Sequence, residues 1–330
     1  MYKVTLSMPI YNVAPYVERA LLSALNQTFE SIEFLLVDDR GTDNSMEIVR
    51  YIIKDHPRGK DVRIIEHPHN IGTGATKNTA IDNAQGEYLF FMDSDDEITP
   101  NCIQLLYDKM MSEKVDMVVG SRERMTNDKV LLKSMIYKDI VIRGNYAILE
   151  NQYRFQNNRI HIETWNKLYN LKFLRDSGIR CIPNHLNEDR FFSTKIFFSL
   201  TSVALTSNLT YHYYVVEGST MYKNTRGFSD RMADQYIETI SYMKENMNFI
   251  NSKLRRYYYY YLIDYIVYLL PGYLNGNFCE RKKKYYLELI RKNMFSPLVF
   301  LSCKSFFKSF VLNSPLWVNR LVFKYLKQLY

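Results

Sequence analysis

Gly86–Asp96 reads GEYLFFMDSDD, an apolar run that ends in three carboxylates within four residues. Residues 88–92 have the composition of a buried strand, and Asp93, Asp95 and Asp96 follow at its carboxyl end. Open α/β sheets bind ligands at the carboxyl ends of their strands. The stretch therefore predicts a sheet whose ligand-binding edge carries acidic side chains.

Strand, loop and helix signals alternate around this stretch. Residues 3–10, 34–37 and 62–65 are short apolar runs typical of buried strands. Helical spacing or capping residues follow each run, at Val17, Leu21 and Leu25, at Asn44 and Glu47, and at Ala80, Ile81 and Ala84. The alternation predicts an α/β fold with a Rossmann-like, mostly parallel sheet flanked by helices. The sequence after Asp230 predicts an α-helical C-terminal region.

Composition places the chain among globular proteins. It has 330 residues, of which 47% are hydrophobic and 24% charged, enough for one large domain with an appendage. The four cysteines lie far apart and the histidines do not cluster, which argues against a disulfide framework and against a zinc site. The N-terminus lacks the basic leader of a signal peptide, so we expect a cytoplasmic protein.

The C-terminal region is basic and aromatic. Residues 250–330 contain 14 Lys and Arg, 3 Asp and Glu and 20 aromatic residues, whereas residues 1–249 carry a net charge of −3. One hypothesis is a peripheral contact of this region with the anionic inner face of the cytoplasmic membrane. The alternative is a helical cap or a homodimer contact with solvated lysines. Residues 281–284 are basic, but no RNA- or DNA-binding motif accompanies them, so we expect no nucleic-acid partner.

The acidic loop at residues 93–96 is suited to a divalent cation. Carboxylates are hard ligands that Mg²⁺ and Mn²⁺ prefer, and such an ion completes its shell with water and phosphate oxygens. A solvated turn before the next helix would use the same residue types. Asp38 and Asp39 end the second strand in a similar way, and could accept hydrogen bonds from a nucleoside or simply begin a helix.

Two further segments add charged groups. Residues 70–74 form a tight glycine-containing loop before Lys77, which suits backbone approach to a diphosphate and its neutralisation. Glu188 and Asp189 precede two phenylalanines, and a carboxylate held there could act as a general base. It could equally offset the dipole of a helix N-terminus. Each segment has a structural explanation by itself, and their combination favours a ligand site.

Together the motifs resemble the family 2 glycosyltransferases with the GT-A fold. The resemblance is close over residues 3–125 and looser over residues 160–222. It rests on SMPIYN (7–12), Gln27-Thr28, FLLVDDRGTDNS (34–45), NIGTGATKN (70–78), GEYLFFMDSDD (86–96), WNKLY (165–169) and NED (187–189). It implies transfer of a sugar from a nucleotide diphosphate donor, expected to be a UDP-sugar, to a hydroxyl of a growing polysaccharide or lipid-linked glycan. Inversion and assistance by Mg²⁺ or Mn²⁺ are implied as well.

The resemblance also implies roles for individual residues. Asp189 would be the catalytic base, and Asp95 would hold the metal. The residues in contact with the nucleotide-sugar would be Pro9, Tyr11, Asp38, Asp39, Lys77, Asp93 and Ser94. Acceptor or diphosphate contacts would come from Trp165, Lys167, Glu188, Ser219 and Thr220. The GT-A catalytic domain would span residues 1–229, with a nucleotide-sugar-binding half (1–125) and an acceptor half (126–229), and the helical region would span residues 230–330.

The chain departs from the family pattern in three places. These are Arg40-Gly41 in place of Gly-Ser, Lys77 in place of an arginine, and Val215-Val216 where a basic residue is common. The last departure leaves the diphosphate to Ser219, Thr220, Lys223 or Arg226, or without such a contact. A non-catalytic nucleotide-sugar-binding protein therefore stays open as an alternative. A sugar nucleotidyltransferase is the other alternative, but it would need a glycine-rich loop where this chain has YNVAP (11–15).

Overall fold

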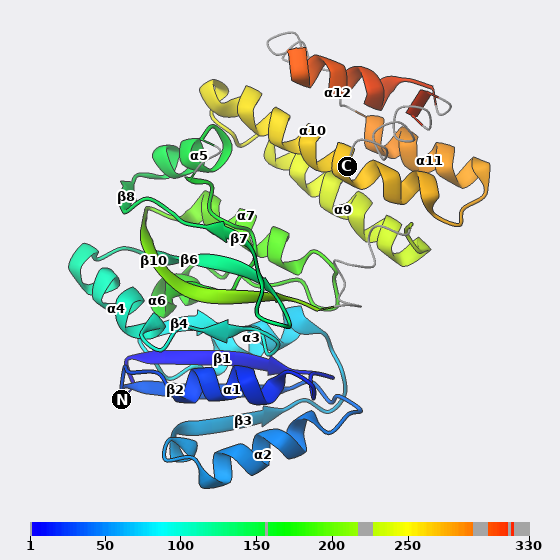
Figure 1. Ribbon diagram of the computed structural model, residues 1–330. Coiled ribbons are helices and arrows are strands. Elements are labelled where there is room, and N and C mark those ends of the chain that lie inside the picture. The colour runs from blue at the N-terminus through cyan, green and yellow to red at the C-terminus, as the bar shows by residue number, and fades with distance from the viewer. Residues whose placement is uncertain (1, 156–157, 217–226, 293–302, 316–317, 320–330) are drawn as a thin grey trace. The chain divides into compact units, whose positions relative to one another are not determined.

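The chain forms two compact units, Met1–Val216 and Glu217–Tyr330. The computed structural model describes residues 2–155, 158–216, 227–292, 303–315 and 318–319 (Figure 1). The first unit holds all of the acidic segments discussed above, and the second holds the basic, aromatic sequence. The functional division that we expect at residue 229 stays a prediction.

The first unit is an α/β structure built around one sheet. Its elements are, in chain order, β1 (Val4–Ile10), α1 (Val17–Leu25), β2 (Ile32–Asp38), α2 (Ser45–Asp55), the 3₁₀ helix η1 (Gly59–Asp61), β3 (Val62–Glu66), α3 (Thr73–Asn83), β4 (Tyr88–Phe91), β5 (Glu97–Ile98), α4 (Cys102–Glu113), β6 (Met117–Thr126), β7 (Leu131–Met135), β8 (Ile140–Arg143), α5 (Asn145–Tyr153), β9 (Lys167–Asn170), α6 (Leu171–Asp176), α7 (Glu188–Ser199) and β10 (Ser202–Val215). The strand, helix and strand alternation predicted for the first hundred residues is confirmed.

The strands lie in the order β3-β2-β1-β4-β9-β6-β10-β5, with β7 paired to β6 and β8 paired to β10. Strands β3, β2, β1, β4, β6 and β10 run in one direction, and β5, β7, β8 and β9 run in the other. The predicted mostly parallel sheet is therefore confirmed. Because Ile10 of β1 pairs with Asp38 of β2 and β4 pairs with the other side of β1, these three strands end at one edge.

Apolar side chains fix this arrangement on both faces of the sheet. Every residue of β2 is buried, as expected for a central strand of a sheet covered on both faces. Helices α1, α2 and α4 contribute to the same buried cluster as β1, β2 and β4, and α3 packs on β1 and β2. The core thus holds the loops after β1, β2 and β4 close together.

The start of α2 differs in detail from the sequence prediction. Asn44 and Glu47 predicted a capping box, but the Asn44 side chain makes no capping hydrogen bond. Instead, the Asp43 carboxylate accepts a hydrogen bond from the backbone N–H of Ser45 at 3.1 Å. Asp43 also accepts from the backbone N–H of Ala14 at 2.9 Å, so this residue joins the start of α2 to the loop after β1.

The second unit is helical in its described part, as predicted. It contains α9 (Asp230–Asn246), α10 (Ser252–Asn275), α11 (Glu280–Arg291) and α12 (Cys303–Asn313). Several of its tyrosines are buried between these helices, and the hydroxyls of Tyr258 and Tyr273 donate to the carbonyls of Met243 and Ala233, both at 2.9 Å. Much of the aromatic sequence is therefore core of this unit.

Among the residues that the structure describes, none of the helices combines the length and the apolar character that crossing a bilayer requires.

Candidate active site

The loop after β4 gathers three carboxylates. Oxygens of Asp93, Asp95 and Asp96 lie within 4.8 Å of one another, on side chains that are partly or fully buried. Burial is the main cause that raises the pKa of each carboxyl, to about 8 for Asp93 and well above its usual range for Asp96. Neighbouring like charges add to the effect at Asp93 and Asp96. Ionisation of these carboxyl groups is therefore unfavourable unless a cation is bound nearby.

Asp96 has a structural task that the sequence analysis did not identify. One of its oxygens accepts a hydrogen bond from the Tyr211 hydroxyl, and the other accepts from the backbone N–H of Tyr214, both at 2.8 Å. The side chain is fully buried. Asp96 thus fixes the acidic loop to β10, and leaves Asp93 and Asp95 as the members best placed to receive a ligand. Tyr211 and Tyr214 lie in YHYYVV (211–216), a segment whose sequence shows the lack of a basic residue but does not indicate a partner for Asp96.

The carboxylates of Asp93 and Asp95 fit a divalent cation. They are hard oxygen ligands at a strand end, and a bound cation would offset the repulsion and burial that raise their pKa values. Mg²⁺ and Mn²⁺ use one or two such carboxylates and take the remaining ligands from water and phosphate. The predicted metal ligand Asp95 is therefore in chemically suitable surroundings, although its role stays a prediction.

Lys77 connects the acidic loop to the predicted base. Its Nζ lies 2.6 Å from Oδ1 of Asp189 and 3.3 Å from Oε1 of Glu188. The residue is only 4% exposed. Burial lowers the pKa of its ammonium, but the facing carboxylates, Asp189 first, outweigh burial and raise the pKa well above its usual range. Lys77 therefore belongs to α3, and its ammonium faces carboxylates from the start of α7 and from the loop after β4.

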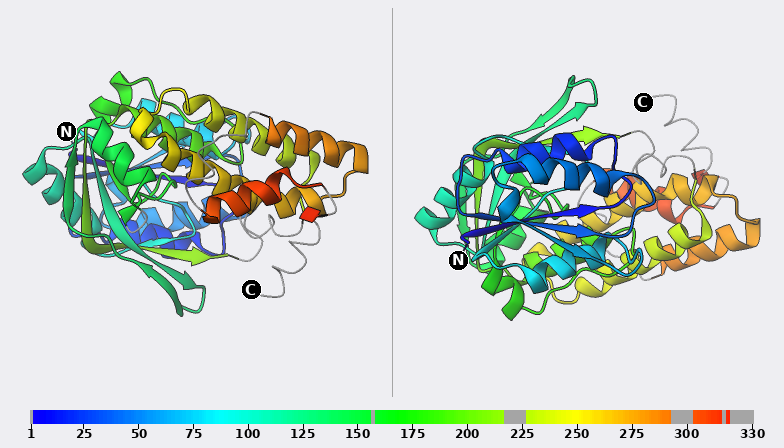
Figure 2. Two further views of the ribbon diagram at one scale, coloured as in Figure 1. Left: turned by 90° about the horizontal axis from the view of Figure 1, so that it is seen from above. Right: turned by 90° about the horizontal axis from the view of Figure 1, so that it is seen from below.

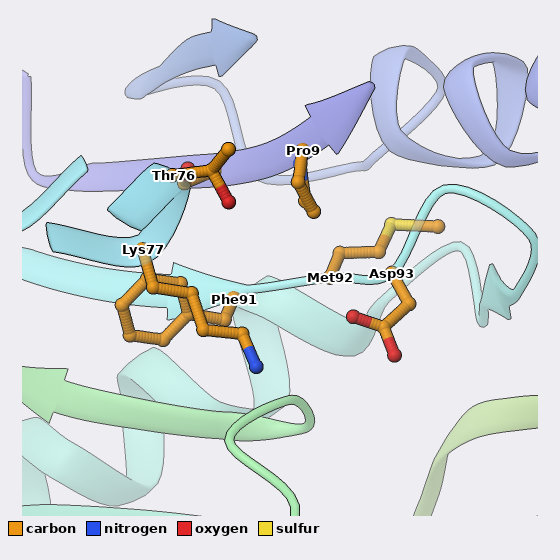
Figure 3. A pocket seen from close by; sticks show the side chains of 7 residues that line it. Pro9, Thr76, Lys77, Phe91, Met92 and Asp93 are labelled. Carbon is orange, nitrogen blue, oxygen red and sulfur yellow. The ribbon is translucent and has the colours of Figure 1, made fainter. Parts of the chain in front are cut away.

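A small pocket contains this cation. It is lined by Ser7, Pro9, Thr76, Lys77, Phe91, Met92 and Asp93. Figure 3 shows the Lys77 ammonium and the Asp93 carboxylate pointing to the same side of this pocket, away from Pro9. Asp93 is also among the charges that raise the pKa of Lys77. The structure therefore brings together three residues from distant segments that the sequence analysis singled out: Pro9, Lys77 and Asp93.

Asp38 and Asp39 are buried at the end of β2 and make protein contacts. Asp39 accepts hydrogen bonds from the backbone N–H groups of Ile71 at 3.0 Å and Gly72 at 2.9 Å, and lies 2.8 Å from Nδ1 of His67. Asp38 accepts from the backbone N–H of Arg40 at 2.8 Å. Asp38 therefore stabilises the loop after β2, and Asp39 stabilises the loop before α3. The predicted contact of this pair with a nucleotide stays a prediction.

The glycines before Lys77 make close contacts inside the protein. We predicted that Gly72 and Gly74 allow the backbone to approach a diphosphate. In the structure a Cβ at Gly74 would lie 2.2 Å from the carbonyl oxygen of Ile182, and a Cβ at Gly72 would lie 3.0 Å from Cα of Asn184. Gly72 also has φ +90°, which favours glycine. These glycines therefore allow residues 182–184, just before α7, to pack closely, and the approach to a diphosphate stays a prediction.

The remaining predicted nucleotide contacts lie near the same edge. Tyr11 follows β1 and is 44% exposed, so its ring is available to a ligand. Ser94, within the acidic loop, is buried. Ser219 and Thr220, like Lys223 and Arg226, lie outside the described residues.

Trp165 and Lys167 are interior residues. Trp165 is 3% exposed, stacks on the ring of Tyr211 at 4.4 Å, and lies under the guanidinium of Arg122. Lys167 is 1% exposed, contacts the carbonyl of Glu163, and has its Nζ 3.0 Å from Nδ1 of His161. The Trp165 ring thereby supports Tyr211, and through it the acidic loop. The predicted acceptor or diphosphate contacts of both residues stay a prediction.

Comparison with known proteins gives a consistent picture. The model of the family described as "Glycosyl transferase family 2" matches residues 5–178. Glycosyltransferase GlyA of Streptococcus pneumoniae is 29% identical over 244 residues, which are 72% of this chain and 34% of that protein. Poly(ribitol-phosphate) beta-glucosyltransferase of Bacillus spizizenii is 28% identical over 218 residues, 64% of this chain and 32% of that protein. The chain thus spans about a third of the length of these curated relatives.

Solved structures show the same fold. TarS 1-349 of S. aureus, in complex with UDP-GlcNAc, has a TM-score of 0.59 and 18% identity, and the match covers 95% of this chain and 76% of that one. Mannosyltransferase PcManGT of Pyrobaculum calidifontis, in complex with GDP-Man and Mn²⁺, has a TM-score of 0.55 and 14% identity, and covers 97% of this chain and 84% of that one. The predicted GT-A fold is confirmed.

Proposed function

This chain belongs to glycosyl transferase family 2, and we propose that it transfers a sugar from a nucleoside diphosphate sugar to a hydroxyl of a growing polysaccharide or lipid-linked glycan. The observation that carries the proposal is the position of Lys77, which contacts Asp189 and shares a pocket with Asp93. Carboxylates from two segments about a hundred residues apart thereby belong to one charged site. A UDP-sugar is the expected donor, and TarS, solved with UDP-GlcNAc, supports that choice.

The proposed reaction is a single displacement with inversion. The acceptor oxygen forms a bond to the anomeric carbon while the bond from that carbon to the diphosphate oxygen breaks, and the nucleoside diphosphate leaves from the opposite face. Asp189 takes the acceptor proton on a carboxylate oxygen as the new bond forms. Its exposed fraction of 25% leaves it open to an acceptor, whereas Lys77 beside it is enclosed.

Lys77 has a second task in this proposal. The contact at 2.6 Å holds the Asp189 carboxylate in one orientation beside a buried positive charge. A lysine in place of the family's arginine provides a compact charge, which suits an enclosed position between carboxylates. We propose that Lys77 positions the base, and that any contact of Lys77 with the diphosphate is made from this ion-paired position.

Asp95 and Asp93 would hold Mg²⁺ or Mn²⁺ against the donor diphosphate. When bound, the ion would stabilise the negative charge that develops on the leaving phosphate. PcManGT, solved with GDP-Man and Mn²⁺, supports the choice of ion. The protein's own contribution is the placement of the two carboxylates, which depends on the Asp96 hydrogen bonds to β10.

We propose that the protein works in the cytoplasm, where nucleotide-sugars are made, and that it reaches a glycan acceptor there or on the inner face of the membrane. The name of the Bacillus relative, a poly(ribitol-phosphate) beta-glucosyltransferase, supports a polymeric acceptor. A peripheral membrane contact of residues 250–330 and a homodimer contact both remain proposals. The buried tyrosines of α10 account for part of the aromatic content through packing, and leave fewer aromatics for a membrane.

A thermal-shift screen tests the donor. The full chain is heated with nucleoside diphosphates and nucleotide-sugars, with and without Mn²⁺, because a specific ligand raises the apparent melting temperature by mass action. Donor hydrolysis with Mn²⁺ then separates an enzyme from a non-catalytic binding protein. Binding of a nucleotide-sugar without hydrolysis or transfer across many acceptors would contradict the proposed enzyme. Formation of a nucleotide-sugar from a nucleoside triphosphate would instead indicate a nucleotidyltransferase.

A further inference from the structure

The hairpin formed by β6 and β7 carries an unusual group of exposed aliphatic side chains. Val130, Leu131, Leu132 and Ile136 are between 51% and 58% exposed. Figure 2 shows this hairpin extending away from the other strands of the sheet in both views. Other exposed apolar residues of the first unit are scattered over separate elements. A local group of this kind marks an interaction surface.

Cations accompany these apolar side chains. Between residues 124 and 139 the exposed charged residues are Arg124, Lys129, Lys133, Lys138, Asp128 and Asp139. Four cations therefore accompany two carboxylates along the hairpin and the residues that follow it. Arg124 lies directly opposite Lys133 on the paired strands, and two like charges so placed repel each other unless an anionic partner is present. The hairpin surface is thus both apolar and positive.

The hairpin begins beside the candidate active site. Strand β6 runs parallel to β10, and Met125 pairs with Tyr214, whose backbone N–H is bonded to Asp96 of the acidic loop. Nζ of Lys129 lies 3.6 Å from Oε2 of Glu97, the first residue of β5. The hairpin therefore continues from the edge of the sheet at which the carboxylates gather. A surface bound by the hairpin would lie next to that edge.

We propose that the β6–β7 hairpin binds an anionic lipid surface. Aliphatic side chains enter the boundary between headgroups and acyl chains, and lysines bind acidic headgroups, so the two kinds of residue act together. A strand from a second copy of this chain is a less favourable partner for the hairpin than a lipid surface. Lys133 stands in the middle of the edge strand β7, and the register shifts between Arg124 and Met125. Both features oppose edge-to-edge strand addition.

The consequence for the reaction rests on the proposed glycosyltransferase function. A hairpin bound to lipid would bring this edge of the sheet close to the membrane. The local concentration of a lipid-linked glycan near the proposed base, Asp189, would then be higher. The lipid contact itself does not depend on catalysis. Its failure and the failure of the proposed function can therefore be distinguished by separate measurements.

Vesicle sedimentation tests the hairpin directly. The full chain is mixed with vesicles of phosphatidylcholine containing 30% phosphatidylglycerol, or with phosphatidylcholine alone, and the bound fraction is measured against lipid concentration. The variant V130S/L131S/L132S is expected to bind the anionic vesicles at least about tenfold more weakly than the parent chain, because three partly exposed aliphatic groups are lost. The variant K133Q/K138Q is expected to bind more weakly at low salt, with the difference shrinking at high salt.

A matched variant elsewhere separates the hairpin from the C-terminal region. F306S/F307S/F310S removes three exposed aromatics of α12, which are between 46% and 59% exposed. The proposal predicts that the hairpin variant loses more vesicle binding than the α12 variant. Equal binding by the hairpin variant and the parent chain would overturn it, and so would loss in the α12 variant alone. A change in oligomeric state of the hairpin variant, seen by light scattering with unchanged vesicle binding, would overturn it in favour of self-association.

Donor hydrolysis in the absence of vesicles completes the design. The hairpin variant should hydrolyse the donor as the parent chain does, because the substituted side chains do not belong to the site. Absence of hydrolysis in the parent chain would contradict the proposed function while leaving the lipid result intact. Circular dichroism of each variant confirms that it is folded.

Discussion

Two pairs of carboxylates at the same sheet edge have opposite surroundings. Asp39 at the end of β2 accepts hydrogen bonds from two backbone amides, and Asp38 accepts one. Asp93 and Asp95 after β4 are instead partly buried beside other carboxylates, and their pKa values are raised. Identical residue types thus have different roles: the first pair stabilises loops, and the second is a crowded pair whose ionised form a cation can stabilise. The surroundings of a carboxylate, more than its place in a motif, indicate its role.

The largest effect should come from Asp189, whose carboxylate lies 2.6 Å from the Lys77 ammonium. Asp189→Asn is expected to lower turnover by about a hundredfold or more while donor binding changes little, because the amide cannot take the acceptor proton. Transfer kinetics and donor titration measure the two quantities separately. Turnover close to that of the parent chain would remove Asp189 from the role of base.

The next largest effect concerns the metal. Asp95→Asn should weaken Mn²⁺ binding by on the order of tenfold to a hundredfold, because a charged ligand becomes neutral. Titration followed by the electron paramagnetic resonance of free Mn²⁺ gives the affinity without any need for activity. An unchanged affinity would show that the acidic loop does not hold the ion, and would remove the contrast between the two carboxylate pairs.

The pH dependence of Mn²⁺ binding sharpens the same contrast. Because the pKa of Asp93 is about 8, a proton competes with the ion below that pH, so the affinity should fall by up to about tenfold per pH unit as the pH is lowered. For the same reason the metal-free fold should lose stability as the pH rises from about 4 toward 8, since the unfolded chain releases this proton first. A flat affinity between pH 6 and 8 would contradict the raised pKa.

The smallest effect on Mn²⁺ binding should come from Asp39. Asp39→Ala leaves the amides of Ile71 and Gly72 without their acceptor, so the free energy of unfolding should drop by about 1–3 kcal/mol. Mn²⁺ affinity should stay within about twofold of the parent value, since this carboxylate is engaged with the protein. Urea unfolding measures the stability, and Asp55→Ala, at an exposed position of α2, is the matched control. A large loss of Mn²⁺ affinity with unchanged stability would reverse the comparison.

Much of the fold could be predicted from local pattern. The apolar runs at 3–10, 34–37 and 88–92 predicted strands that the structure contains, and the helical spacing after residue 230 predicted the helices of the second unit. The capping box at Asn44 was wrong in detail: the Asn44 side chain makes no capping hydrogen bond, and the neighbouring Asp43 carboxylate accepts from the N–H of Ser45. Local competition between neighbouring polar side chains decides such details, and spacing does not encode it.

The candidate site was predicted in part. The acidic loop and Lys77 were recognised as charged groups at one edge, but their partners were not. Asp189 stands 112 positions after Lys77, and no local pattern pairs them. The glycines at 72 and 74 were recognised as positions of close approach, yet the approaching backbone belongs to residues 182–184. The stacking of Trp165 on Tyr211 likewise joins residues that lie far apart in sequence.

The sequence by itself determined the alternation of strands and helices along the chain, the acidic character of the sheet edge and the family. Hydrophobic periodicity and motif spacing are properties of neighbouring residues, so they can be recognised without the fold. Tertiary structure decided which carboxylates accept hydrogen bonds from backbone amides, which are crowded by like charges, and which face the buried lysine. Those outcomes depend on the donors and charges that distant segments bring within a few ångströms. Hydrogen bonding and burial fix the charge state of a side chain, and both arise only when the chain has packed.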